Sequence, residues 1–388
     1  MFLSLVALRS LATLLLPAGL ARRSLLATQC VLIPALFVAL LLMPSLAPLT
    51  RPVLETQSPA AFAWPPLWFL GLNDVLVGRD EPVLRELACT AWIAVAGVFL
   101  LGCAAYLVAF HRDVVRFRGG MPSPRPTGVW RGGARALMLL VVRDPLARAT
   151  CAFTLATLTR SPRHRLPLVA YLGGGLALAC GSVAAVLGGS GEAMVALTPV
   201  TLAVQFNLLF FLLAGVRSVA DLPAELRAVW LFRCRAADAL SRYLAGTRSA
   251  VFLFGVLPLL LLLAPAHALL WGWYPAAVHA AWGVGFAAIV WAVLFRRFDR
   301  MPFACPAPPG RGRLTSRLWL HLAGYYVAVY LPAWAERVAI ERPGLAVVSA
   351  TLALGCLAQV AVREPSGPRA DRVPSFDQPA GEIQQLGL

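Results

Sequence analysis

Two long runs without a charged residue, separated by a short loop, dominate the middle of this sequence. The first extends from Leu166 to Gly189 and the second from Ala193 to Val216, with a three-residue loop at 190–192. Arginines border the pair, at 160–165 on one side and at Arg217 on the other. A helix needs roughly 20 consecutive apolar residues to cross a bilayer core of about 30 Å. The pattern therefore predicts a transmembrane hairpin whose two ends lie on the same basic side.

The same unit, a basic loop followed by two apolar runs, recurs along the chain and predicts an all-α polytopic membrane protein. About eight spans in four hairpins are expected, at 25–49, 88–110, 166–189, 193–216, 251–270, 275–295, 318–334 and 345–362. Composition agrees, because 59% of the residues are hydrophobic and only 13% are charged, against roughly 25% charged in soluble domains. No folded soluble domain is expected.

Five regions follow from this assignment. Residues 1–24 are expected to be an interfacial segment, 25–110 a first hairpin with a long outer loop, 111–165 a basic cytoplasmic loop, 166–362 a six-span core, and 363–388 a polar, disordered tail. Alternatively, 1–20 forms an additional span, which would move the N-terminus outside. Within the basic loop, 134–159 is apolar but is interrupted at Pro145. Two short pieces broken by a proline favour amphipathic interfacial or re-entrant helices over a span.

The distribution of charge sets the expected orientation. All 34 basic residues are arginine, the formal net charge is +16, and most of the arginines lie in connections on one side of the predicted spans. Cytoplasmic loops carry such an excess, so both termini are expected in the cytoplasm, the membrane is expected to be the bacterial inner membrane, and anionic lipids are expected to contact these arginines. Nucleic acid is not an expected partner, because the arginines border apolar spans.

Ionisable groups inside a membrane are costly and usually functional. All 18 acidic residues are assigned to loops or to the tail, with Glu336 in the last outer turn. This predicts that no carboxylate lies in the membrane core and argues against proton-driven transport. Two polar side chains, Gln205 and Asn207, remain inside a predicted span. They either line a path or hydrogen-bond a neighbouring helix, and the second interpretation is the more common one.

Two histidines, His267 and His279, flank an aromatic turn at 271–274 and are expected to approach each other near the outer surface. A pair of histidines can bind a metal, but a zinc site needs at least three protein ligands and no third is evident. No metal or cofactor is therefore expected. On the helix at 166–189, Gly173, Ala177 and Gly181 repeat at four-residue spacing, which favours close helix packing in lipid; glycine and alanine are also simply common in such helices.

Enzyme motifs are scarce. No HExxH metalloprotease motif is present, and the absence of lysine excludes a P-loop ATPase. Residues 188–191 read Gly-Gly-Ser-Gly and resemble the GxSG motif of rhomboid serine proteases, which would make Ser190 the nucleophile and His279 its partner. The alternative interpretation is a tight Gly-Ser turn.

An amphipathic helix is expected at 221–246, starting at Asp221 with a proline two residues later and ending at Gly246. With this helix, the arginine-rich inner loops and the short outer turns, residues 111–362 resemble the permease subunits of bacterial ABC-type exporters. The resemblance implies a separate ATPase subunit that docks on this helix through Asp221, Glu225, Arg227 and Arg235. Alternatively the helix lies on anionic lipid, or the whole chain is a non-catalytic membrane scaffold.

Overall fold

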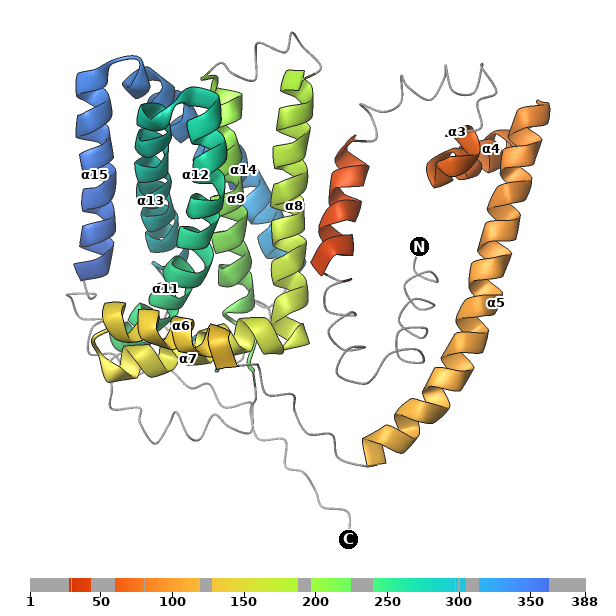
Figure 1. Cartoon of the computed structure of the whole chain (residues 1–388), viewed down its shortest axis with the longest axis horizontal. Helices are drawn as coiled ribbons and strands as arrows, with labels where there is room; N and C mark the ends of the chain where they lie inside the picture. Colours follow the sequence, from red (N-terminus) through yellow and green to blue (C-terminus); the bar gives the residue numbers. More distant parts are fainter. Residues whose placement is uncertain are drawn as a thin grey trace. The chain divides into compact units, whose positions relative to one another are not determined.

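The computed structural model describes residues 28, 30–42, 60–79, 81–118, 128–187, 197–224, 240–296, 298, 301–304 and 314–362. Over these residues the chain is helical and has no strand, which confirms the all-α class. The helices in Figure 1 are α3 Ala60–Ala63, α4 Pro65–Leu76, α5 Pro82–Arg118, α6 Gly128–Val141, α7 Pro145–Arg160, α8 Pro162–Leu187, α9 Pro199–Val219, α11 Leu240–Val251, α12 Leu257–Trp271, α13 Trp273–Phe295, α14 Leu314–Ile340 and α15 Pro343–Val362. A π-helical turn, η3 Phe252–Val256, joins α11 to α12, and a further helix covers Cys30–Leu42.

Proline sets the start of many of these helices. α4, α5, α7, α8, α9 and α15 all begin with it, because its fixed φ suits the first helical position and its missing N–H would have no partner there. The side chain of Asp144 caps α7 by accepting from two backbone N–H groups. Thr198 caps α9 in a capping box with Thr201. Local chemistry therefore fixes these helix starts independently of tertiary packing.

The chain divides into two compact units. The first comprises Met1–Leu32 and Leu42–Thr127, and the second Ile33–Leu41 and Gly128–Leu388. In the first unit, α4 packs against the start of α5 around the buried side chains of Leu67 and Leu87. Gly71 permits this approach, because a Cβ atom there would lie 2.7 Å from Leu87 Cβ.

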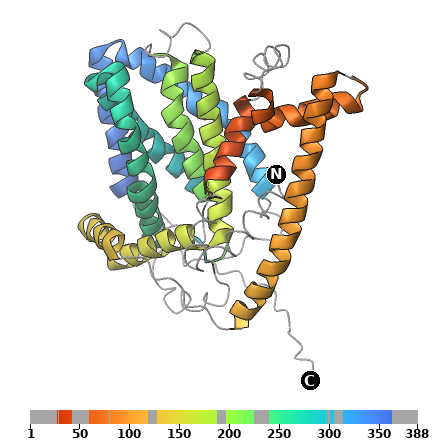
Figure 2. The same ribbon diagram turned by 45° about the vertical axis from the view of Figure 1, so that its right-hand side comes forward.

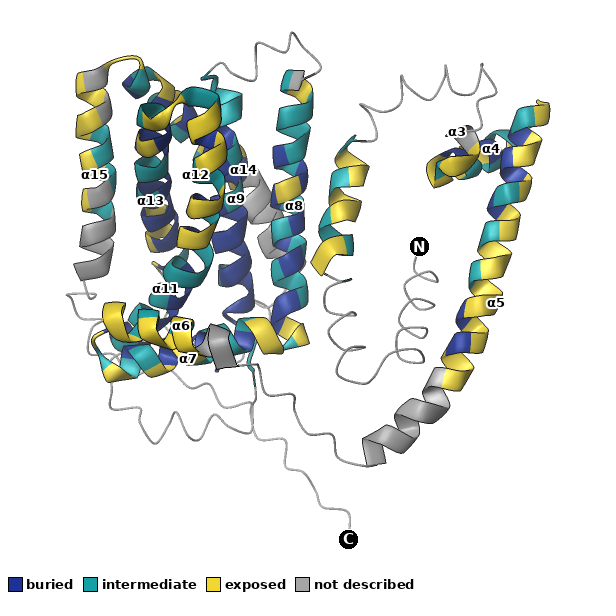
Figure 3. Ribbon diagram, viewed as in Figure 1, coloured by how far each residue is buried: buried dark blue, intermediate teal, exposed yellow. Residues whose placement is uncertain are grey.

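The second unit is a helical bundle with α9 at its centre, and α9 is almost wholly buried (Figure 3). It packs against α8, α13 and α14, and its phenylalanines Phe206, Phe210 and Phe211 belong to the main core. A Cβ atom at Gly175 on α8 would lie 2.8 Å from Phe211 Cβ, so a glycine is needed where these two helices meet. Across the same interface Ser218 Oγ donates to the hydroxyl of Tyr171 at 2.8 Å.

Two helices, α6 and α7, lie across one end of this bundle instead of running along it (Figures 1 and 2). They are separated at Asp144 and Pro145, so the predicted break of the 134–159 segment into two short helices is confirmed. α7 packs closely along α11. Gly246 of α11 makes this possible, because a Cβ atom there would lie 2.7 Å from Thr150 Cβ and closer still to the carbonyl oxygen of Ala147.

Five segments among the described residues are long and apolar enough to cross a membrane: Pro82–Val108, Pro162–Val186, Pro199–Val219, Leu240–Trp271 and Trp273–Phe295. The chain is therefore a helical protein of membrane type. The helix at Cys30–Leu42, in the expected first span, is shorter. The expectations for 1–24 and for the tail at 363–388 lie outside the described residues.

Several expected boundaries are wrong. The second span was expected at 88–110, but α5 starts at Pro82 and extends to Arg118, because no glycine or proline interrupts it strongly enough to end it before Gly119. Gly246 was expected to end a helix, yet the helix continues through it into η3 and α12. The expected helix start at Asp221 is a turn after α9, held by backbone hydrogen bonds from Ala224 N to Phe303 O and from Phe303 N to Ala220 O.

The last correction concerns α14. The seventh span was expected to stop at Trp334, before a charged outer turn, but α14 continues to Ile340. This extension carries Glu336 into the bundle instead of leaving it in a loop.

Candidate functional site

A buried pair of ionisable side chains joins α13 to α14. His279 Nδ1 lies 2.9 Å from both carboxylate oxygens of Glu336, and both side chains are 0% exposed. Taking two ionisable groups out of water costs several kcal/mol for each ion unless they are paired and hydrogen-bonded. The His279–Glu336 contact is therefore a specific feature of this bundle and contradicts the expectation that every acidic residue lies in a loop or in the tail.

A second histidine and a tryptophan complete the cluster. The ring of His267, on α12, lies 4.8 Å from that of His279 between centroids, which confirms that the two histidines approach each other. Trp271 stacks on His267 with an interplanar angle of 11°, and Phe206 of α9 meets His279 edge-on. The aromatic rings of Phe206 and Trp271 thus pack against His279.

Two polar atoms of this cluster lack a partner. His279 Nε2 and Trp271 Nε1 are buried and form no hydrogen bond to any residue that the structure describes. Buried polar atoms are normally satisfied, so these two are exceptions within the bundle. No group of three or more His, Cys, Asp or Glu suited to a metal occurs among the described residues, and no metal is assigned to the cluster.

Both polar residues expected inside a span are buried and contact neighbouring helices. Gln205 Nε2 donates to the carbonyl oxygen of His279 at 2.8 Å, so it holds α9 to α13 directly beside the buried pair. Asn207 Nδ2 donates to the carbonyl oxygen of Gly175 at 2.9 Å and holds α9 to α8. These bonds correspond to the helix-joining interpretation of the two side chains.

The three small residues of α8 have different surroundings. A Cβ atom at Gly173 would lie 2.9 Å from the Cα of Pro34, so Gly173 lets the helix at 30–42 approach α8. Ala177 is fully buried. A Cβ atom at Gly181 would have no described atom within 4 Å, so no close approach to a described residue requires this glycine. The glycine of α8 that the sequence pattern missed is Gly175.

The expected ATPase contacts are only partly described. Glu225, Arg227 and Arg235 lie outside the described residues. Asp221 is buried and accepts a hydrogen bond from Arg217 at 2.9 Å, while the Arg217 guanidinium also lies over the Phe298 ring at 4.7 Å. His164 joins this junction through Nε2, which lies 2.8 Å from the carbonyl oxygen of Leu222. Asp221 therefore stabilises the end of α9.

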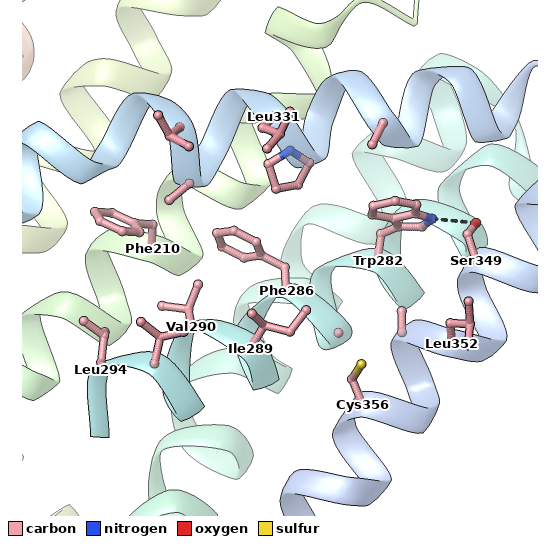
Figure 4. Close-up of a pocket in the computed structure, with 17 residues that line it drawn as sticks. Phe210, Trp282, Phe286, Ile289, Val290, Leu294, Leu331, Ser349, Leu352 and Cys356 are labelled. Carbon is pink, nitrogen blue, oxygen red and sulfur yellow. Dashed lines mark hydrogen bonds between the residues drawn. The ribbon is translucent and has the colours of Figure 1, made fainter. Parts of the chain in front are cut away.

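A second candidate site is an apolar cleft of about 630 Å³ between α13, α14 and α15 (Figure 4). It is lined by Phe210 of α9 and by apolar side chains of the other three helices, among them Phe286, Ile289, Leu331 and Leu352. A hydrogen bond between two of its lining residues runs from Trp282 Nε1 to Ser349 Oγ at 3.1 Å. Along α13 the lining extends from Trp282 to Leu294, which at 1.5 Å per residue is about 18 Å.

The cleft fits an apolar ligand by size and chemistry. Small-molecule sites typically enclose about 300–1,000 Å³ and are lined mainly by hydrophobic and aromatic side chains. Its length is close to the depth of one leaflet, about half of the 30 Å hydrocarbon core. A ligand dissolved in the bilayer therefore matches this cleft better than a polar solute does. The sequence could not indicate it, because its lining comes from four helices that are separate in the chain.

The Gly-Gly-Ser-Gly segment with Ser190 lies outside the described residues, and His279, its expected partner, is hydrogen-bonded to Glu336.

Comparisons with known proteins found no matching family model, no matching curated protein and no matching solved structure.

Proposed function

We propose that this chain is the permease subunit of a membrane transporter, that its substrate is apolar or amphipathic, and that a separate ATPase subunit supplies the energy. The observation that carries the proposal is the apolar cleft between α13, α14 and α15 (Figure 4). A substrate of this class partitions into the bilayer and reaches such a cleft sideways, between helices, without crossing a polar pore.

About eight spans in four hairpins are part of this proposal. Five segments meet the length and hydropathy expected of a span, and α14 and α15, of 27 and 20 residues, have lengths of about 40 and 30 Å at 1.5 Å per residue. The helix at Cys30–Leu42 lies within the remaining expected span. Each of the eight apolar runs thus contains a described helix.

The orientation is supported by where the arginines lie. Arg148, Arg160 and Arg163 belong to α7 and the start of α8, and Arg217 and Arg296 to the ends of α9 and α13, at the end of the bundle that α6 and α7 cross (Figure 1). By the positive-inside rule, this end faces the cytoplasm in our proposal. We extend the proposal to a bacterial inner membrane with both termini on the cytoplasmic side. An ATPase subunit would dock there, and anionic lipids would surround the arginines.

The test is purification of the tagged chain in mild detergent, followed by mass spectrometry and an ATPase assay. We expect a stoichiometric P-loop ATPase whose activity rises when amphipathic compounds are added. Ile289→Trp fills the cleft from α13, at a side chain that is 52% exposed, and should abolish that stimulation. Leu262→Trp is the matched control, because Leu262 is also exposed, at 74%, but lies on α12 away from the cleft.

Two results would contradict this function. A chain that purifies without any ATPase is not the permease half of such a transporter and agrees better with a membrane scaffold. An ATPase that copurifies but responds equally in both tryptophan variants would refute the cleft as the substrate site, while leaving the energised complex intact.

A further inference from the structure

The His279–Glu336 pair has a restricted set of charge states. Both side chains are 0% exposed. A carboxylate beside a neutral imidazole has a net charge of −1, so the pair is neutral only when it has bound one further proton. A net charge in a buried, apolar environment is strongly disfavoured. Protons bound by two groups in such close contact belong to the pair and not to either residue.

The position of the exchangeable proton follows from the hydrogen bonds. His279 Nδ1 faces the carboxylate, so the neutral pair carries a hydrogen on Nε2 as well. If that proton leaves, Nε2 keeps a lone pair and the pair has a net charge of −1. Nε2 is also the ring atom without a partner among the described residues, and it is therefore the atom at which a proton enters or leaves.

The described side chains that lie against the pair carry no permanent charge. α12 contributes His267, whose ring is 4.8 Å away between centroids, and α9 contributes the neutral Gln205 and Phe206. α15 has no charged residue between Pro343 and Val362. On α14, Arg337 follows Glu336 but is exposed and hydrogen-bonds Glu341, so it points away from the pair.

We propose that His279 and Glu336 form a buried, reversible proton-binding site, with Nε2 of His279 as the atom that takes up the proton and His267 as the neighbouring relay group. The step is a simple proton transfer: Nε2 of the neutral imidazole beside the carboxylate takes one proton from a hydronium ion, so an N–H bond forms, an O–H bond breaks and water is released. Because the site joins α13 to α14, its protonation state is coupled to the contact between the two helices that also line the apolar cleft. The site does not depend on the proposed ATPase.

The test is a pH titration of the full-length chain in lipid nanodiscs by infrared difference spectroscopy, with histidine labelled by ¹³C in the ring. The chain has five histidines, and ring vibrations distinguish imidazole from imidazolium. We expect one component that His279→Gln removes and whose midpoint Glu336→Gln displaces by at least one pH unit, a tenfold change in proton affinity. His164→Gln is the control, because His164 bonds Leu222 and Ser161 at the α7–α8 junction.

The proposal is overturned if Glu336→Gln titrates like the unchanged protein, or if His164→Gln alters the same component. Glu336→Gln keeps the size and a hydrogen-bonding oxygen, and its folding is checked by size exclusion. If it does not fold, the unchanged protein still decides the matter, because five histidines that all titrate as free imidazole would exclude a site shared with Glu336.

Discussion

The contact between α7 and α11 makes Gly246→Ala a sharp test of the packing. A Cβ atom at this position would lie 2.7 Å from Thr150 Cβ and closer still to the Ala147 carbonyl oxygen, whereas carbon atoms pack best at about 3.5–4.0 Å. The two helices must therefore separate by about 1 Å, because a backbone oxygen cannot rotate away. Overpacking of this kind costs about 1–3 kcal/mol, and Gly246→Ala should fall at the upper end.

The assay is reversible unfolding in mixed detergent micelles, followed by circular dichroism. Gly181→Ala is the matched control, because it is also an interior helical glycine but has no described atom within 4 Å of an added Cβ. It should stabilise the protein by about 0.5–1 kcal/mol, since alanine loses less backbone entropy on folding. Equal effects of the two substitutions would refute the close approach of α7 and α11.

Three further predictions concern single contacts. Gly283→Ala places a Cβ atom 2.8 Å from Leu260 Cδ2 and against the amide of Gln205. It should lower the free energy of unfolding by about 1–3 kcal/mol in the same assay, and an unchanged stability would contradict the packing of α9 on α13. The Asp144 pKa is lowered from its usual value, chiefly by the hydrogen bond from Arg242. The ionised carboxylate therefore stabilises the fold fully above the unfolded pKa of about 3.9, and this contribution is lost as the pH falls through the lower folded pKa. The difference in unfolding free energy between the unchanged protein and Asp144→Asn should be constant from about pH 5 to 8 and vanish in acid, and a difference that persists in acid would exclude the ion pair as its source. Burial raises the Cys151 pKa to about 11, so maleimide at pH 8 should leave this thiol unmodified in the folded protein, and rapid labelling would show that α7 is not packed as described.

Apolar runs predicted the helices well, because crossing a bilayer and forming a continuous helix impose the same local requirement on the sequence. The break before α7 was also readable, since a proline preceded by a capping aspartate marks a helix start. These features depend on neighbouring residues. They needed no knowledge of which helices touch.

The failures came from partners far apart in the sequence. Glu336 looked like the start of a charged outer turn, but its hydrogen-bond partner His279, 57 residues away, lies inside the bundle and draws it in. Gly246 looked like a helix end, but it is required by the approach of α7. A charge or a glycine has two opposite interpretations, and only the tertiary contact decides between them.

The candidate site was predictable to a limited extent for the same reason. The pattern indicated that Gln205 lies inside a span and that His267 and His279 approach each other. It could not indicate that Gln205 hydrogen-bonds the backbone of His279, 74 residues away, or that four helices form an apolar cleft. The lining side chains are mostly apolar, as are their neighbours along the same helices, so no local signal marks them.

Native mass spectrometry of the protein released from detergent tests the central claim most directly, namely that the cleft between α13, α14 and α15 holds an apolar ligand from the membrane. We expect the unchanged protein and Leu262→Trp to retain a bound lipid or other apolar molecule after detergent washing, and Ile289→Trp to have lost it. Identical retention by all three proteins would place the bound molecules elsewhere and would contradict an apolar ligand in this cleft.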